Sequence, residues 1–275
     1  MKFGFVLPDL DVATAPAFAA LAEASGWDGV FIPDCISIEV PGAHPMPAAD
    51  PWITLATMAM ATQRVRLGPM VAAVPRRRPW KLAREVATLD HLSHGRMILP
   101  AGIGAASDDA GFREVGEELS VRARAGMMDE TLAILDGLWR GEPFSFAGSH
   151  FRVGSMTQLP RPVQRPRVPL WIVGVVGARK SIERALRWDG IVVQKSGGLA
   201  LSKDVRQLVA AASAAPRLTP FDIIVEGSTA PGDAAGMDRV ARRAEAGATW
   251  WMESMWSEHT DEGLRARIGA GPPKR

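Results

Sequence analysis

The most regular pattern of apolar and polar positions lies in the segment RRRPWKLAREVATLDHLSHGR, at residues 76–96. Within it Leu82, Val86 and Leu89 recur at helical spacing, and Gly95 follows where a helix would end. An almost uniformly apolar run stands on each side, as expected for parallel strands that are buried on both faces. The pattern therefore predicts a strand–helix–strand unit, which cannot form a core by itself.

The same alternation of apolar runs and helical patterns continues along the chain. Because crossovers between parallel strands are right-handed and neighbouring strands tend to pair, eight such repeats predict a single (β/α)8 TIM barrel over residues 1–275. A doubly wound sheet would normally carry a Gly-x-Gly-x-x-Gly turn after its first strand, and here that turn is PDLDVA. The predicted strands are residues 2–8, 29–34, 65–74, 96–103, 170–175, 190–194, 221–226 and 249–253.

Other local signals mark the ends of elements. Thr14, Asp50–Pro51 and Ser120 are typical of helix starts. Residues 144–153 alternate on both sides of an Ala-Gly-Ser turn, which predicts a short hairpin inserted between the fourth helix and the fifth strand. The helix that begins at Ser120 is expected to bury Val121, Met128, Leu132, Leu135 and Trp139.

Two strand openings also resemble each other. The segments WDGVFIPDC at 27–35 and WDGIVVQKS at 188–196 begin the second and sixth predicted strands. Those strands lie half a barrel apart if eight strands close into a ring. The similarity is therefore a weak internal echo that favours the barrel.

Composition narrows the class of protein. Hydrophobic residues make up 47% of the chain and charged residues 23%, which fits a well-cored soluble protein. A net charge of +2 argues against nucleic acid as the main partner, and a single cysteine excludes an internal disulfide. The N-terminus does not read as a signal peptide, and no apolar run reaches the roughly 20 residues that a membrane span needs. We therefore expect a cytoplasmic protein with no membrane partner.

In a TIM barrel the chemistry lies at the carboxyl ends of the strands, and the opposite face serves stability. This rule places His91 and His94 at the far face, as turn residues. No pair of histidines or acidic residues has the spacing of a metal site, so we expect no metal. The rule places at the mouth Asp9, Asp34, Cys35, the loop with His44, Met70, Val71, Arg76–Arg78, Gly102–Ser107, Gly174–Arg179, Gln194, Lys195, Glu226, Glu253 and His259.

Glycines are concentrated after the fourth and fifth predicted strands, in GIGAAS and VGVVGAR. A glycine-rich turn lets backbone amides and the positive end of a helix approach an anion, typically a phosphate. Arg179 would add a charge-assisted hydrogen bond. Two interpretations stay open from these residues alone: a phosphate site, or ordinary tight turns.

The segment RRRPWKLAREVATLDHLSHGRMILPAGIG resembles the central signature of the bacterial-luciferase-like flavin-dependent oxidoreductases. FREVG, GLWRGEPFSFAGSHFRV, PRPVQRPRVPLWIVG and RALRWDGIVV continue this resemblance in the same order over essentially the whole chain. Members of the family are (β/α)8 barrels that bind FMN or the deazaflavin F420 at the barrel mouth. The resemblance therefore implies hydride transfer to, or monooxygenation of, a small organic substrate.

The resemblance also implies cofactor contacts. Asp34 stands where members contact the flavin ring system, and Met70–Val71 stands where a non-proline cis peptide often faces the ring. Gly102, Ile103 and Gly104 would line the ring edge or the ribityl chain. A bulky residue at Gly174 is expected to abolish cofactor binding and leave the fold intact. The phosphate would be held by Val173, Gly174, Val175, Val176, Gly177 and Arg179.

The candidate catalytic residues are Cys35 and Glu253. Many F420-dependent members have His where this chain has Cys35, and sugar-phosphate dehydrogenases have a catalytic Glu where it has Ala105, so both positions argue against that chemistry. Cys35 is either a small packing residue or a polar donor near the ring. Glu253 either protonates a substrate or pairs with Arg76–Arg78, which we favour. These arginines could otherwise reach an acidic substrate or the F420 tail, or simply form a solvated loop.

Two functions of other classes stay open. The chain could bind flavin without turning it over, as non-fluorescent flavoproteins do. It could also be a barrel enzyme that uses the strand-five turn to hold a phosphorylated metabolite. Whichever function holds, exposed helices or the hairpin could pair two copies into a homodimer.

Overall fold

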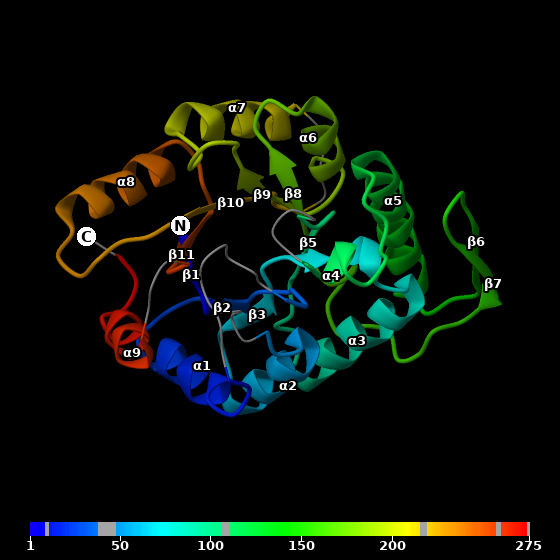
Figure 1. The fold of residues 1–275 in the computed structure, drawn as a ribbon, viewed down its shortest axis with the longest axis horizontal. Coiled ribbons are helices and arrows are strands. Elements are labelled where there is room, and N and C mark those ends of the chain that lie inside the picture. Colours follow the sequence, from blue (N-terminus) through cyan, green and yellow to red (C-terminus); the bar gives the residue numbers. More distant parts are fainter. Residues whose placement is uncertain (9–10, 38–47, 106–109, 215–218, 257–259, 274–275) are drawn as a thin grey trace.

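The computed structural model describes residues 1–8, 11–37, 48–105, 110–214, 219–256 and 260–273. Of the residues predicted at the mouth, Asp9, His44, Ala106, Ser107 and His259 lie outside these ranges. Its parallel sheet runs in the order β3-β2-β1-β11-β10-β9-β8-β5-β4. Since β4 follows β3 in the chain and pairs with β5, the two ends of the sheet meet, and the strands form a nearly closed barrel (Figure 1). The strands are β1 (Lys2–Val6), β2 (Gly29–Ile32), β3 (Arg66–Pro69), β4 (Ala72–Ala73), β5 (Leu99–Gly102), β8 (Leu170–Val175), β9 (Gly190–Gln194), β10 (Asp222–Gly227) and β11 (Trp250–Ser254).

Helices surround the barrel, so its strands are covered on their outer face (Figure 1). The predicted TIM barrel is confirmed. None of the helices in the described ranges combines the length and the apolar composition of a membrane span. The helices are α1 (Ala15–Ala24), α2 (Pro51–Ala61), the 3₁₀ turn η1 (Val74–Arg76), α3 (Pro79–Leu92), α4 (Ala110–Arg113), α5 (Val121–Leu138), α6 (Arg179–Ala185), α7 (Ser202–Ser213), α8 (Ala234–Glu245) and α9 (Asp261–Gly269).

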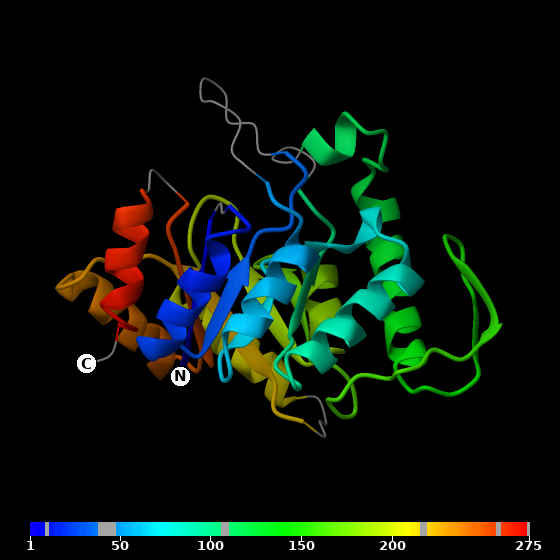
Figure 2. The same cartoon turned by 90° about the horizontal axis from the view of Figure 1, so that it is seen from below.

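The alternating segment after α5 forms an antiparallel pair outside the barrel. It consists of β6 (Phe144–Ala147) and β7 (Arg152–Met156), and it projects away from the barrel beyond α5 (Figure 2). Glu130 of α5 holds its turn, because its carboxylate accepts the backbone N–H groups of Ser149, His150 and Phe151.

Large side chains fill the inside of the barrel. The ring of Trp171 stacks on Phe31 with 5.8 Å between ring centres, and Trp250 packs edge-on against Trp171 at 5.1 Å. All three are buried, together with Met252 and Ile224. The interior is therefore a packed core rather than a pore, and a ligand has room only at the ends of the barrel.

The repeated Trp-Asp-Gly openings have a common structural role. Asp28, before β2, accepts the backbone N–H of Phe3 at 2.8 Å. Asp189, before β9, accepts the N–H of Leu170 at 3.0 Å. Each aspartate thus accepts a backbone N–H group at the start of the preceding strand. In the sheet order β2 and β9 lie half a barrel apart, as predicted.

The predicted third strand, residues 65–74, is two short strands. β3 ends at Pro69 and β4 begins at Ala72, and the Met70–Val71 peptide between them is cis. The structure thus has the non-proline cis peptide that the family resemblance implied here. Its contact with a cofactor stays a prediction.

The helix ends follow the sequence signals in part. Asp50 caps α2 by accepting the N–H groups of Trp52 and Ile53 at 3.0 Å, as predicted. Thr14 does not cap α1, because its hydroxyl donates to a carbonyl in the preceding turn. Val121 is 62% exposed at the first position of α5, so the prediction that it is buried is wrong.

Candidate functional site

The predicted cofactor contacts come from the carboxyl ends of separate strands. Asp34 follows β2, Met70–Val71 joins β3 to β4, and Gly102 ends β5. A Cβ built on Gly102 would lie 3.1 Å from Val173 Cγ2 and 3.3 Å from Val71 Cγ2. These residues therefore meet at one rim, and in Figure 2 α4 lies at this upper rim while the chain begins at the lower one.

Asp34 is the centre of a buried ion cluster. Its carboxylate lies 3.0 Å from Arg76 Nη2 and 2.6 Å from Arg77 Nη2, and it also accepts the N–H of Ala73 at 3.1 Å. The side chains of Asp34, Arg76 and Arg77 are 1%, 3% and 18% exposed. Arg77 also lies over the ring of Trp52, 5.0 Å from its centre. Charge-assisted hydrogen bonds thus fasten the segment after β2 to β4 and η1.

This cluster changes the interpretation of the arginine run. The predicted solvated loop is wrong for Arg76 and Arg77, and of the three arginines only Arg78 is exposed. Four donors already reach the Asp34 carboxylate, so its contact with a ring system stays a prediction. Cys35, the next residue, is partly buried, and its role also stays a prediction.

A second buried arginine shapes the loop after β5. Arg124 of α5 is 4% exposed, and its Nη1 donates to the carbonyls of Ile103 and Gly104 at 2.9 and 2.7 Å. Burial lowers the pKa of the Arg124 guanidinium, and the two carbonyls replace part of its lost hydration. Gly104 has φ +76°, and a Cβ there would lie 2.4 Å from the ring of Phe112. The loop therefore needs glycine at this position.

The sequence analysis missed Arg124, although the signal was present. Arg124 stands four residues before Met128 on the inner stripe of α5. We expect Arg124→Met to lower the free energy of unfolding by about 2–3 kcal/mol, because two carbonyls lose a charged donor. Arg122→Met, at an exposed position of the same helix, should change it by less than about 0.5 kcal/mol. Urea denaturation measures both, and equal effects would contradict the assignment.

The turn between β8 and α6 is open, as the phosphate interpretation requires. Gly177 has φ +88°, and a Cβ built on it would meet no atom within 4 Å. The N–H groups of Gly177, Arg179 and Lys180 have no backbone acceptor among the described residues. The Arg179 side chain, however, is 82% exposed and pairs with Glu183 on the same helix at 3.0 Å. The turn thus offers backbone donors, while the guanidinium is engaged elsewhere.

Gly174 faces away from the mouth. A Cβ there would lie 2.3 Å from Ile191 Cδ1 and 3.8 Å from Ala185 Cβ of α6. The expectation that a bulky residue at Gly174 spares the fold is therefore wrong. The reason is the alternation of side chains along a strand, which points Val173 into the barrel interior and Gly174 to the helix side.

Glu253 also faces away from the mouth. It is fully buried, its carboxylate accepts the hydroxyl of Thr229 at 3.0 Å and the indole N–H of Trp251 at 2.9 Å, and Arg267 Nη2 lies 3.3 Å away. The favoured pairing of Glu253 with Arg76–Arg78 is therefore wrong. Its role as a proton donor stays a prediction, and this burial does not support it.

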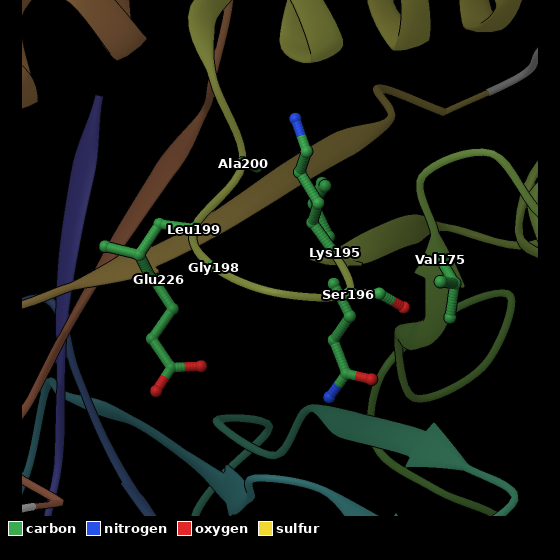
Figure 3. Close-up of a pocket in the computed structure, with 9 residues that line it drawn as sticks. Val175, Lys195, Ser196, Gly198, Leu199, Ala200 and Glu226 are labelled. Carbon is green, nitrogen blue, oxygen red and sulfur yellow. The ribbon is translucent and has the colours of Figure 1, made fainter.

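Two adjoining cavities open at the carboxyl ends of the last four strands. The β9 cavity, of about 360 Å³, is lined by the end of β8, the loop after β9 and Glu226 (Figure 3). The β10–α9 cavity, of about 600 Å³, is lined by the loop after β10, the end of β11 and α9. Leu199 and Glu226 belong to both walls. Within the described ranges no cluster of three or more His, Cys, Asp or Glu could hold a metal ion.

Comparison with known proteins gives consistent matches. The sequence model of the luciferase-like monooxygenase family matches residues 1–274. An uncharacterized protein of Mycobacterium tuberculosis is 33% identical over 198 residues, which cover 66% of this chain and 68% of that protein. Further matches are enzymes whose names specify F420, flavin or FMN.

Solved structures show the same fold. An F420-dependent secondary alcohol dehydrogenase superposes with a TM-score of 0.77 at 18% identity, over 98% of both chains. The monooxygenase RslO1 of Streptomyces bottropensis superposes with a TM-score of 0.78 at 20% identity, over 98% of this chain and 96% of that one. At these identities the structural matches establish the fold alone.

Proposed function

The chain belongs to the luciferase-like monooxygenase family, and on that premise we propose that it is an oxidoreductase that uses FMN or F420 at the carboxyl end of the barrel. The observation that carries the proposal is the meeting of Val71, Gly102 and Val173, which come from three separate strand ends, at one rim. The substrate would be a small organic molecule that accepts a hydride or an oxygen atom. The cofactor supplies that redox chemistry, and the protein supplies orientation and electrostatics.

The residues at the rim fit such a cofactor. Val71 and Val173 provide an apolar surface for a flat ring, and Gly102 between them adds no side chain. The phosphate would lie on the turn after β8. Among the described residues, no backbone carbonyl accepts the N–H groups of Gly177 and Arg179, so both are open to a ligand. An apolar floor with amide donors at one edge matches a ring system that ends in a phosphate.

The two buried arginine clusters would position this site rather than react. Asp34 with Arg76 and Arg77 holds the segment after β2 against β4, next to the cis peptide. Arg124 holds the carbonyls of the loop after β5. A fixed rim is what a cofactor site needs, because displacements of about 1 Å already cost activity.

Titration of the purified protein with FMN and with F420, followed by fluorescence, tests the proposal. We expect one cofactor to bind at least about tenfold more tightly, a difference of about 1.4 kcal/mol. Gly177→Val should weaken that binding, since a side chain would cover the amides of the turn. Gly26→Val is the matched control, because Gly26 has φ +87°, an open Cβ position and a place in a turn at the opposite face. Saturation by a sugar phosphate without binding of either cofactor would contradict the proposal.

A further inference from the structure

We propose that the β10–α9 cavity is the substrate pocket of this enzyme. It would take an uncharged, mainly apolar organic molecule whose single hydrogen-bond donor group is directed at Glu226. This inference rests on the proposed function, which leaves the substrate class open. It is drawn from the size of the cavity, from its apolar wall and from the charges in that wall.

The size and the wall suit a small apolar ligand. About 600 Å³ lies within the range of small-molecule sites, which is roughly 300–1,000 Å³. Pro231, Met255, Trp256 and Ala266 contribute apolar surface to the wall. Trp256 and Leu199 are 45% and 52% exposed, although both are large apolar side chains. A ligand in the cavity would remove this apolar surface from water.

Glu226 sets the charge of the pocket. It lies at the end of β10, in the wall between the two cavities, and its Oε1 accepts the indole N–H of Trp256. In Figure 3 its carboxylate extends in the direction opposite to the ammonium group of Lys195. That ammonium pairs with Asp204 of α7 at 2.8 Å. An ionised carboxylate is purely an acceptor and repels anions, so the ligand must present a hydroxyl or N–H group.

The guanidinium group of Arg267, in the same wall, already has hydrogen-bond and ion-pair partners within the protein. Arg267 donates to the carbonyl and the hydroxyl of Thr229, both at 2.9 Å, and to the carbonyl of Gly271 at 2.8 Å. Its Nη2 also lies 3.3 Å from the Glu253 carboxylate, and its side chain is 6% exposed. A phosphate or carboxylate on the ligand would therefore find no unengaged cation among the described residues of this wall, which argues against a phosphorylated substrate.

Ligand-observed NMR titration of the protein without added cofactor tests the pocket with 4-phenyl-2-butanol and with 4-phenylbutanoate. These probes share the phenyl group and the chain length, and they differ in charge. We expect the alcohol to bind at least about tenfold more tightly than the carboxylate. Glu226→Gln should remove most of this preference, because the repelling charge is gone.

A substitution that fills the β10–α9 cavity is the second test of the inference. Ala266→Trp, at an exposed position in the cavity wall, should weaken binding of the alcohol by about tenfold or more. Ala210→Trp, at an exposed position of α7 outside both cavities, should leave it unchanged. Equal affinity of the two probes for the wild-type protein, or unaltered binding to Ala266→Trp, would overturn the inference.

Cofactor titration of the same variants separates the two proposals. If neither FMN nor F420 binds the wild-type protein, the proposed function fails, and the probe titrations still report on the pocket. If Ala266→Trp abolishes cofactor binding, the cavity belongs to the cofactor and the pocket inference is overturned. Intact cofactor binding with lost binding of the alcohol supports both proposals.

Discussion

Replacing Asp34 with alanine is expected to lower the free energy of unfolding by about 3–5 kcal/mol, because two guanidinium groups lose their carboxylate in a buried place. Arg76 and Arg77 are 3% and 18% exposed, so water cannot replace the missing charge in full. The N–H of Ala73 loses its acceptor as well. Urea denaturation with an unchanged m-value measures the loss.

The control for Asp34 is an exposed ion pair. Glu183 and Arg179 also lie 3.0 Å apart, but their side chains are 55% and 82% exposed. Glu183→Ala should therefore change the free energy of unfolding by less than about 1 kcal/mol. In the Asp34→Ala background, Arg77→Met should recover part of the loss, because it removes one uncompensated charge. If Asp34→Ala were as mild as Glu183→Ala, the cluster would not hold the rim.

Replacing Glu253 with glutamine distinguishes a structural carboxylate from a catalytic one. The structure predicts a loss of about 3–5 kcal/mol, because Arg267 keeps its charge in a buried network without a counter-charge. A proton donor at the active site would behave differently, since its removal would abolish turnover and leave stability nearly unchanged. Thermal and urea denaturation, combined with a turnover assay of the cofactor-loaded protein, separate these outcomes.

Glu226→Gln is the matched control, because Glu226 is also a glutamate at the end of a strand. Its side chain lines both cavities and is partly exposed, so its removal should cost less than about 1 kcal/mol of stability. Arg267→Met combined with Glu253→Gln should be more stable than Glu253→Gln alone. Normal stability of Glu253→Gln with lost turnover would restore the catalytic interpretation.

The sequence determined the architecture of this protein. Uniformly apolar runs specify strands buried on both faces, and their regular alternation with helical patterns specifies a barrel. The Asp50–Pro51 start of α2 follows from local chemistry, because the Asp50 carboxylate accepts the N–H groups of Trp52 and Ile53, two and three residues further along the chain. The rule that chemistry lies at the carboxyl ends of strands also predicted that Asp34, Met70–Val71 and Gly102 lie at one rim.

Only the tertiary structure decided which side chains face that rim and which partners they have. Glu253 and Gly174 lie at the correct ends of their strands, yet both point to the helix side, because a shift of one residue along a strand reverses the face. The arginine partners of Asp34 lie 42 and 43 residues away along the chain, and the arginine partner of Glu253 lies on α9. Register and helix packing set such contacts over long separations, and no local pattern of apolar and polar residues encodes them.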